Sequence, residues 1–347
     1  MSLINIAHDP GFGAMKTGYL NGSGPQAVVL PSVVGAGTLS HNNLSTGLET
    51  GPAPERPMQV QFMGQSYLVG ANVHRETKPI ERLDFDHLTD GPELRGLMYA
   101  SLFQALGPQE VELNLLLGMP VEVVQNRDMD SQTLSRLRGW LIGTHDFCVN
   151  NVVVSYKINQ VKRMAQPMGA FFQWGADDNG QWIRSDNPAG KFAVADIGMN
   201  TFDLLVIENK QVIQRFSQGE NLGTRRALSF IRQTVYERYG YKPSFYEADQ
   251  LARHYTAKRE AVISHMHGEH SAYPIVAQAV QECWAGVQDM IGEIWDNTRQ
   301  FRRLIFTGGG AELLSNQIKR THPTAIIMGQ TANVLGLAKF AQREGVF

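Results

Sequence analysis

Two short turns in different halves of the chain pair an aspartate with a glycine in the same way. The first, in HDPGFGAMKTGYL, holds Asp9 and Gly11, and the second, in ADIGMNTFDLLV, holds Asp196 and Gly198. Each turn follows a short apolar run and leads into another, which predicts a β-hairpin. Backbone N–H groups in a glycine-rich turn can cradle an anion, and a carboxylate beside them suits phosphate when Mg²⁺ lies between the two. The pair therefore predicts a clamp for a polyphosphate and its metal, with ordinary turn aspartates as the alternative.

Other groups near these turns fit the same chemistry. Lys16 places a cation on the second strand of the first hairpin, and Thr201 places a hydroxyl in the second turn. A Walker A loop needs glycine directly before its lysine, but Met15 stands there. The spacing G-x-G-x-x-G is also absent, because Lys16 occupies its last glycine position. The P-loop and Rossmann interpretations are therefore disfavoured.

A run of three glycines in LIFTGGGAEL lies between a predicted buried strand and a predicted helix. Consecutive glycines cost conformational entropy when the chain folds, so their presence requires a reason. They allow a flat ligand or a phosphate to approach the backbone at a helix N-terminus. A tight turn from strand to helix is the alternative explanation for Gly308, Gly309 and Gly310.

Composition limits the class of protein. The 347 residues are 43% hydrophobic and 18% charged, which predicts about two domains with a large core. The net charge of −2 favours neither direct nucleic-acid binding nor membrane binding. Two cysteines without a C-x-x-C pattern fit a reducing compartment rather than a disulfide scaffold. With no signal peptide and no apolar run of about 20 residues, a soluble cytoplasmic protein is expected.

Apolar periodicity and turn residues predict the elements that carry these groups. Strands are expected at 3–8, 14–20, 27–35, 111–124 and 304–307, as hairpins within 60–73 and 192–213, and as two strands within 151–167. Helices are expected at 89–106, 131–143, 222–239, 246–257, 274–300 and 332–344. Polar loops are expected at 36–57 and 174–191. Strands and helices alternate in both halves, which predicts an α/β fold with mixed sheets.

Taken together, these segments resemble the actin, Hsp70 and sugar-kinase ATPase superfamily. DPGFGAMKTG is similar to its first phosphate motif, VADIGMNTFDLLV to its second and IFTGGGAEL to its adenosine motif, while LLLGMP and ANVLGLAKF resemble its two connecting motifs. The segments LPSVVG, YLVGANV, KINQVKRMAQPMGA and the terminal ANVLG are similar to ParM-type plasmid-segregation proteins and archaeal actin-like proteins. The matching motifs span residues 9 to 340 in the order of the family.

The resemblance implies two duplicated ribonuclease H-like lobes with a nucleotide between them. Lobe I would comprise 1–172 and 331–347, and lobe II 173–330. The metal would be Mg²⁺, held mainly through water by Asp9 and Asp196. The phosphates would be lined by Gly11, Gly13, Lys16, Gly198 and Thr201, and the nucleoside by Gly219, Glu220, Gly308, Gly309 and Gly310. The second turn departs from the family pattern, because Met199 and Asn200 stand where many relatives have glycine.

Gln166, in RMAQPMGA, separates the activities found in this superfamily. Actin carries glutamine in the comparable place, whereas sugar kinases depend on an aspartate base. An amide can orient a water molecule for attack on a phosphate, but it is a poor general base. Gln166, with Asp9 and Asp196, therefore favours hydrolysis over phosphorylation of a metabolite. The alternative is that Gln166 only caps a local backbone group.

The expected function is an actin-like nucleoside triphosphatase, using ATP or GTP, that polymerises into filaments. By family analogy it would segregate or position plasmid DNA through a DNA-binding adaptor protein. The alternatives are a small-molecule or cofactor kinase of the same superfamily and a nucleotide-gated scaffold with little turnover.

Three other clusters have ordinary explanations. In SHMHGEH, His265, His267 and His270 could ligate a metal, but an exposed loop between two helices is the favoured interpretation. The basic segments 224–226 and 299–303 are expected to be solvated helix faces. The tryptophans of the predicted 274–300 helix, Trp284 and Trp295, are expected to pack in the core.

Overall fold

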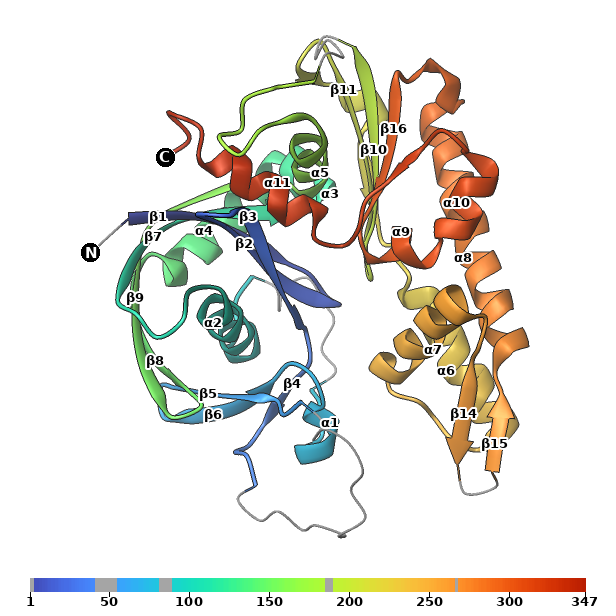
Figure 1. Ribbon diagram of the computed structural model, residues 1–347, viewed down its shortest axis with the longest axis horizontal. Helices are drawn as coiled ribbons and strands as arrows, with labels where there is room; N and C mark the ends of the chain where they lie inside the picture. Colours follow the sequence, from blue (N-terminus) through green and yellow to red (C-terminus); the bar gives the residue numbers. More distant parts are fainter. Residues whose placement is uncertain (1–2, 41–54, 81–88, 185–189, 266–267) are drawn as a thin grey trace. The chain divides into compact units, whose positions relative to one another are not determined.

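The computed structural model describes residues 3–40, 55–80, 89–184, 190–265 and 268–347. Its chain forms two compact units (Figure 1). Unit 1 comprises Met1–Met119, Val123–Ile183 and Val334–Phe347, and unit 2 comprises Pro120–Glu122 and Arg184–Asn333. The lobe bounds inferred from the family resemblance remain a prediction.

Unit 1 is organised around a mixed sheet. Within the described residues, its strand order is β3-β2-β1-β7-β9-β8-β5-β6-β4. The strands are β1 (Leu3–Pro10), β2 (Ala14–Asn21), β3 (Gly24–Pro31), β4 (Val34–Ala36), β5 (Met58–Phe62), β6 (Gln65–Val69), β7 (Val111–Met119), β8 (Gly143–Val149) and β9 (Val152–Ala165). Strand β1 pairs antiparallel with β2 and parallel with β7, so the predicted mixed sheet is confirmed.

Helices cover both faces of this sheet. They are α1 (Val73–Glu76), α2 (Pro92–Leu106), α3 (Val121–Gln125), α4 (Arg127–Leu141), α5 (Gln166–Gly175) and α11 (Ala332–Ala341). The strands curl around α2, which contacts β2, β3, β5 and β6 (Figure 1). On the other face, α11 shares an apolar cluster with Ala7 and Leu116. Residues 6–10 of β1 and most of β7 are buried, which explains why apolar residues occur on both faces of these strands.

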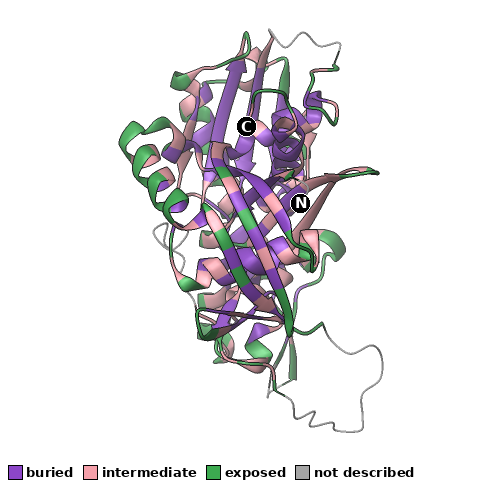
Figure 2. Ribbon diagram, turned by 90° about the vertical axis from the view of Figure 1, so that its left-hand side faces the viewer, coloured by how far each residue is buried: buried purple, intermediate pink, exposed green. Residues whose placement is uncertain are grey.

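Alternation along β1 decides which side chains reach which face. Ile6 joins the cluster around α2, whereas its neighbour Ala7 joins the cluster around α11. Since successive residues of a strand point to opposite faces, His8 lies on the α2 face and Asp9 on the α11 face. In β8 and β9 the same alternation places some side chains in solvent (Figure 2).

Unit 2 contains a smaller mixed sheet. Within the described residues its order is β12-β11-β10-β16-β17, with β13 also pairing with β11. The strands are β10 (Lys191–Ile197), β11 (Phe202–Glu208), β12 (Gln211–Val212), β13 (Gln218–Glu220), β16 (Arg303–Thr307) and β17 (Ile326–Ile327). The α-helices are α6 (Arg225–Tyr239), α7 (Phe245–Lys258), α8 (Tyr273–Trp295), α9 (Gly309–Leu313) and α10 (Ser315–Thr321).

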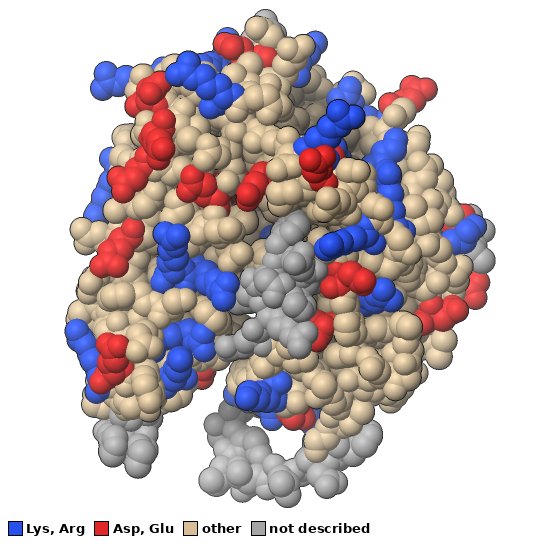
Figure 3. Space-filling model, turned by 180° about the vertical axis from the view of Figure 1, so that it is seen from behind, with Lys and Arg blue, Asp and Glu red and all other residues tan. Residues whose placement is uncertain are grey.

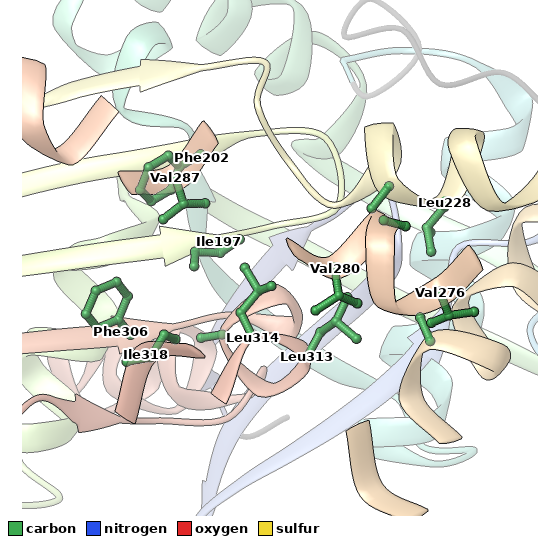
Figure 4. Close-up of a cluster of buried hydrophobic side chains, with 14 of the residues drawn as sticks. Ile197, Phe202, Leu228, Val276, Val280, Val287, Phe306, Leu313, Leu314 and Ile318 are labelled. Carbon is green, nitrogen blue, oxygen red and sulfur yellow. The ribbon is translucent and has the colours of Figure 1, made fainter. Parts of the chain in front are cut away.

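The core of unit 2 lies between this sheet and its helices (Figure 4). Ile197, the last residue of β10, and Phe202, the first residue of β11, are fully buried. Trp295 is also fully buried and its indole Nε1 donates to the carbonyl of Phe216, while Trp284 packs against Phe306 and His322. The predicted packing role of both tryptophans is confirmed.

Several element bounds differ from the predicted ones. Helix α4 begins at Arg127 rather than Ser131, because the Asn126 side chain caps it by accepting from the N–H groups of Asp128 and Met129. The segment expected to contain two strands within 151–167 is one strand, β9. Asn159 interrupts the alternation as a β-bulge opposite Leu113 and Asn114, but the strand continues through it to Ala165.

Two predictions in unit 2 also need correction. The segment expected as a loop at 264–270 takes part in a hairpin of β14 (Val262–His265) and β15 (Gly268–Ser271). His267 lies outside the described residues. The helix predicted to run to residue 300 ends at Trp295, where Asp296 adopts a positive φ, and a short 3₁₀ turn over Thr298–Gln300 follows.

Two surface properties complete the description. On the face seen in Figure 3, acidic and basic side chains are interspersed over the described residues. Across the described part of the chain, no helix combines the length and apolar character required to span a bilayer.

Candidate functional site

The first acidic turn builds an ion pair near the carboxyl end of β1, an interior strand of the sheet. Asp9 lies directly opposite Lys16 in the β1–β2 register, so both side chains point to the same face. Lys16 Nζ donates to Asp9 Oδ2 at 2.8 Å. Asp9 is almost fully buried, with 2% of its side chain exposed against 14% for Lys16. Because an unpaired buried carboxylate is costly, Lys16 stabilises the charge of Asp9 in this position.

Gln166 reaches the same carboxylate from a distant segment. Strand β9 runs parallel to β7 and ends at Ala165, opposite Met119, and helix α5 begins at Gln166. Gln166 Nε2 donates to Asp9 Oδ1 at 2.5 Å. The structure therefore brings Asp9, Lys16 and Gln166 together within unit 1. Their catalytic roles remain a prediction.

Glycines make this close approach possible. A Cβ at Gly118, near the end of β7, would lie 3.1 Å from Gln166 Cγ. In the turn itself, a Cβ at Gly11 would lie 2.7 Å from the carbonyl oxygen of Ala14. A side chain at either position would therefore crowd the groups around Asp9.

Ser32 fixes the first turn and was missed as a site residue. Its hydroxyl donates to the carbonyl of Gly11 at 2.6 Å, and its N–H donates to the carbonyl of Gly13 at 3.1 Å. The segment LPSVVG contributed to the family resemblance, but nothing in its residue types indicated that Ser32 holds the glycine turn. Two hydrogen bonds, to the carbonyls of Gly11 and Gly13, restrict the orientation of the N–H groups proposed to face phosphate.

On the face of the first hairpin that packs against α2, buried polar side chains form a hydrogen-bonded series. His8 Nδ1 is 2.9 Å from Thr17 Oγ1, which is 2.7 Å from Ser101 Oγ on α2. All three residues are inaccessible to solvent, and His8 Nε2 has no protein partner. Burial, partly opposed by the charge of Asp9, lowers the pKa of His8 from 6.5 to about 4.

This shift predicts a loss of stability in mild acid. Below pH 6.5 the unfolded chain protonates His8, whereas the folded chain does not until about pH 4, so stability falls across that interval. The contribution of His8 to the free energy of unfolding should fall by up to about 1.4 kcal/mol per pH unit. Between pH 6.5 and 5 this amounts to about 2 kcal/mol. Urea unfolding of the nucleotide-free protein at several pH values measures it as the difference between wild type and His8→Leu, because the raised pKa of Asp203 changes stability in the opposite sense over the same interval. The His8→Leu variant should lose this component, and an unchanged pH slope in that variant would refute the assignment.

The second acidic turn places two carboxylates side by side. Asp196 on β10 lies directly opposite Asp203 on β11, and both are buried. Asn333 Nδ2 donates to Asp196 Oδ2 at 2.6 Å. Asp203 Oδ1 accepts from the N–H of Val121 at 2.7 Å. Asp203 and Asn333 were not predicted as site residues. The direct pairing of β10 with β11 places Asp203 beside Asp196, and a tertiary contact from α11 places Asn333 there.

The environment of Asp203 opposes its ionisation. Burial, reinforced by the negative charge of Asp196, raises the pKa of Asp203 from 3.8 to about 7. The hydrogen bonds from Val121 and Thr201 oppose this shift. The hydroxyl of Thr201, predicted to face phosphate, therefore also interacts with Asp203.

Backbone hydrogen bonds fix the second turn despite its unusual residues. Gly198 donates to the carbonyl of Thr201 at 2.9 Å. The N–H groups of Gly223, Thr224 and Arg225 then donate to the carbonyls of Asn200, Gly198 and Met199. The start of α6 thus holds the turn, so the chain does not depend on the double glycine of many relatives.

The three positions after β16 carry glycine for different structural reasons. Gly308 adopts φ +90°, and its Cβ would lie 2.5 Å from Asp196 Oδ1. A Cβ at Gly310 would overlap the side chain of Ile197. Close packing against β10 gives a reason for glycine at both positions, and their approach to the adenosine remains a prediction. At Gly309 the nearest atom to an added Cβ is Arg253 Nη2, at 3.2 Å, so its role toward a ligand remains a prediction.

Gly219 and Glu220 lie on β13, beside the second acidic pair. Gly219 is opposite Asp203, and its Cβ would lie 2.6 Å from Asp203 Oδ1. Glu220 Oε1 accepts from Gln218 Nε2 at 2.9 Å. Packing against Asp203 explains the need for glycine at 219, and the proposed contacts of both residues with a nucleoside remain a prediction.

The oxygen-rich composition of these turns suits a hard cation. Within the described residues, no cluster of three or more His, Cys, Asp or Glu side chains could hold a metal by itself. Magnesium commonly uses one or two carboxylates together with waters and phosphate oxygens. Near Asp196, the buried atoms Asp203 Oδ2, Thr307 Oγ1 and Asn333 Oδ1 have no protein partner. These oxygens are compatible with a hydrated metal. Asp9 and Asp196 belong to different units, so the prediction that both hold one metal remains a prediction.

Family models match both parts of the chain. The model described as the N-terminal domain of actin-like proteins matches residues 7–169. The model described as the C-terminal domain of the archaeal MreB-like actin homologue matches residues 194–320. A comparison with curated protein sequences gives no match.

Solved structures agree in fold over nearly the whole chain. A 15-stranded ParM filament from Clostridium botulinum is 19% identical with a TM-score of 0.74, covering 99% of both chains. The archaeal actin homologue Ta0583 is 16% identical with a TM-score of 0.74, covering 98% of this chain and 99% of that one. The Bacillus thuringiensis ParM with ADP is 15% identical with a TM-score of 0.67, covering 98% of both chains. The predicted two-lobed actin-like α/β fold is confirmed.

Proposed function

Because this chain is a prokaryotic actin-like protein, we propose that it hydrolyses ATP or GTP with Mg²⁺ and that the nucleotide controls its assembly into filaments. The observation that carries the proposal is the arrangement of Gln166 and Lys16 around the buried carboxylate of Asp9. A cation, a carboxylate and an amide at the end of a glycine turn are the groups that phosphoryl transfer to water requires.

The roles of these groups differ. Lys16 neutralises phosphate charge, and Asp9 and Asp196 hold the water shell of Mg²⁺. Gln166 uses its amide to orient the attacking water while its contact with Asp9 keeps the side chain in place. The residues facing the phosphates are Gly11, Gly13, Gly198 and Thr201. The residues approaching the nucleoside are Gly219, Glu220, Gly308, Gly309 and Gly310.

The geometry favours hydrolysis over transfer to a metabolite. A sugar-kinase mechanism needs a carboxylate that is free to take a proton from the acceptor hydroxyl. The two oxygens of Asp9 instead accept from Gln166 and Lys16. Gln166 itself has no useful proton affinity, so it serves a water molecule rather than an acidic hydroxyl.

Filament formation and a cellular role are proposed by analogy with similar structures. One similar structure is a ParM filament, and others are a ParM with ADP and a ParM with AMPPNP. By analogy, we place this chain in the cytoplasm as a filament that segregates or positions DNA through an adaptor protein. Its cysteines, Cys148 and Cys283, are both free thiols, which fits a reducing compartment.

Sedimentation with and without nucleotide tests the proposal. With Mg²⁺ and ATP or GTP, the protein should pellet as filaments visible by electron microscopy, and phosphate should be released slowly. Removing Mg²⁺ with EDTA should reduce pelleting and phosphate release to the level seen without nucleotide, because the carboxylates then repel the triphosphate. Filaments without phosphate release would indicate a scaffold. Phosphate transfer to a small acceptor without pelleting would indicate a kinase and contradict the proposal.

A further inference from the structure

The start of α6 and the second acidic turn form one hydrogen-bonded unit. The backbone N–H of Arg225, the first residue of α6, donates to the carbonyl of Met199 at 2.7 Å. The N–H groups of the two preceding residues, Gly223 and Thr224, donate to two further carbonyls of the turn. The side chain of Arg225 is therefore attached directly beside the turn that we expect to face phosphate.

Helix α6 begins with two arginines at positions where acidic side chains are favoured. Arg225 and Arg226 are its first two residues, and its first turn holds no acidic residue. The partial positive charge of a helix N-terminus repels cations, so this placement opposes the local preference. Arg226 is exposed to solvent, as predicted for this basic segment, whereas Arg225 is half-buried. Departures from local preference are expected at functional sites, which makes Arg225 a candidate for one.

Two contacts hold the guanidinium of Arg225 against unit 2. Its Nη1 donates to Asn200 Oδ1 at 3.4 Å, and its Cζ lies 5.6 Å from the centre of the Phe245 ring. The same ring has the guanidinium of Arg232 at 3.9 Å, so two cations flank one aromatic side chain. Asn200 is one of the two residues by which the turn departs from the glycine pattern of many relatives. The departure therefore brings a cation to the turn.

The second acidic turn combines negative charge with unfilled hydrogen-bonding capacity. Asp196 and Asp203 are buried directly opposite one another. Beside them, the buried atoms Asp203 Oδ2 and Thr307 Oγ1 have no protein partner, and native proteins usually satisfy such atoms with water, an ion or a ligand. A polyphosphate at this turn would be repelled by both carboxylates. Mg²⁺ offsets part of that repulsion, and a guanidinium on the phosphates offsets more of it.

We propose that Arg225 binds the polyphosphate of the nucleotide and gives the site a preference for triphosphate over diphosphate. The proposal deepens the proposed function and rests on it. The planar guanidinium can donate two parallel hydrogen bonds to phosphate oxygens, which a point charge such as lysine cannot. Asn200 is a positioning residue that keeps the guanidinium at the turn. Because a triphosphate carries more negative charge than a diphosphate, it gains more from this cation.

Titration calorimetry with Mg²⁺ and either ATP or ADP tests the preference, with GTP and GDP in their place if the wild type prefers guanine. Arg225→Ala should weaken triphosphate binding about tenfold or more, the scale for a hydrogen bond between charged groups, and diphosphate binding less. Arg225→Lys should keep part of the preference. Arg226→Ala, the matched control at the exposed neighbour, should keep all of it. An unchanged affinity ratio in Arg225→Ala overturns the inference, because a purely structural role weakens both nucleotides equally.

A double-mutant cycle tests the positioning role of Asn200. Asn200→Ala should lower the ratio of triphosphate to diphosphate affinity, but by less than Arg225→Ala does, because the ring of Phe245 still contacts the guanidinium. Adding Asn200→Ala to Arg225→Ala should lower the ratio no further. If the two effects add, Asn200 does not act through Arg225 and its positioning role is wrong.

Inorganic tripolyphosphate separates failure of the inference from failure of the proposed function. With Mg²⁺, it should raise the urea midpoint of nucleotide-free wild type more than that of Arg225→Ala, since only binding to the folded protein stabilises it. Equal shifts in both proteins overturn the inference alone. A wild-type protein that tripolyphosphate stabilises through Arg225, but that neither releases phosphate nor assembles with nucleotide, supports the inference and contradicts the proposed function. A wild type that binds neither nucleotide nor tripolyphosphate overturns both.

Discussion

Replacing Gln166 with alanine should slow steady-state phosphate release about a hundredfold, the scale for loss of one positioned hydrogen-bonding group in a transition state. Nucleotide affinity and filament assembly should remain close to wild type. Asp9 keeps its contact with Lys16 when Gln166 is removed, so the carboxylate and its charge balance persist. The amide that orients the attacking water is lost, and binding of the ground-state nucleotide does not require it.

Phosphate release, nucleotide titration and sedimentation measured on the same preparation separate these effects. The matched control is Gln173→Ala, which truncates the other glutamine of α5 and leaves the Gln166–Asp9 contact in place. That variant should hydrolyse nucleotide at nearly the wild-type rate. If Gln166→Ala loses nucleotide binding by the same factor as hydrolysis, Gln166 acts only by supporting Asp9, and its role toward water is wrong.

The hairpins of the two acidic turns were predictable because their signals are local. Glycine-rich turns between apolar runs predict hairpins in any context, and the strands β1–β2 and β10–β11 confirm them. The juxtaposition of Asp9 with Lys16 also follows from hairpin register. Gln166 lies 157 residues from Asp9, and only the family resemblance associated it with the site.

Residues that act through tertiary contacts gave no such signal. Ser32 and Asn333 are ordinary polar residues in the sequence, and their importance depends on the atoms that the fold places beside them. Asp203 lies in the strand after the turn and looks like one polar residue in an apolar run. Only its position opposite Asp196 shows that two carboxylates share a buried site.

The glycine run shows that one sequence signal can have two causes. Three glycines predict close approach of a ligand, and Gly308 and Gly310 are also required because Asp196 and Ile197 occupy the space that a Cβ would fill. Sequence identifies a position where a side chain is excluded, but it does not identify what excludes it. Packing and ligand binding therefore look the same until coordinates separate them.

The same reasoning identifies Gly336 as the glycine whose replacement should be most damaging. It lies on α11, and an added Cβ would overlap the carbonyl oxygen of Gly169 on α5 and crowd the backbone N–H of Gln173. Backbone atoms cannot rotate away as a flexible side chain can, so the two helices would have to separate. Helix α11 also packs on Ala7 and Leu116, so separation would disturb the sheet that carries Asp9.

Gly336→Ala should therefore destabilise unit 1 by about 3 kcal/mol or more, at the upper end of the cost of overpacking. The matched control is Gly292→Ala in α8, where nothing lies within 4 Å of the added Cβ. Alanine is the better helix former, so this control should gain about 0.5–1 kcal/mol. Urea unfolding followed by tryptophan fluorescence measures both changes, since Trp140, Trp174 and Trp182 report on unit 1 and Trp284 and Trp295 on unit 2.

The two variants make the same chemical change and differ only in what surrounds the new methyl group. A Gly336→Ala protein as stable as wild type would show that α5 and α11 do not approach as closely as the structure describes. Recovery of soluble Gly292→Ala but not of Gly336→Ala would support the close approach. Because the Asp9 site is built on the strands beneath α11, purified Gly336→Ala should also bind nucleotide more weakly, whereas Gly292→Ala should bind it normally.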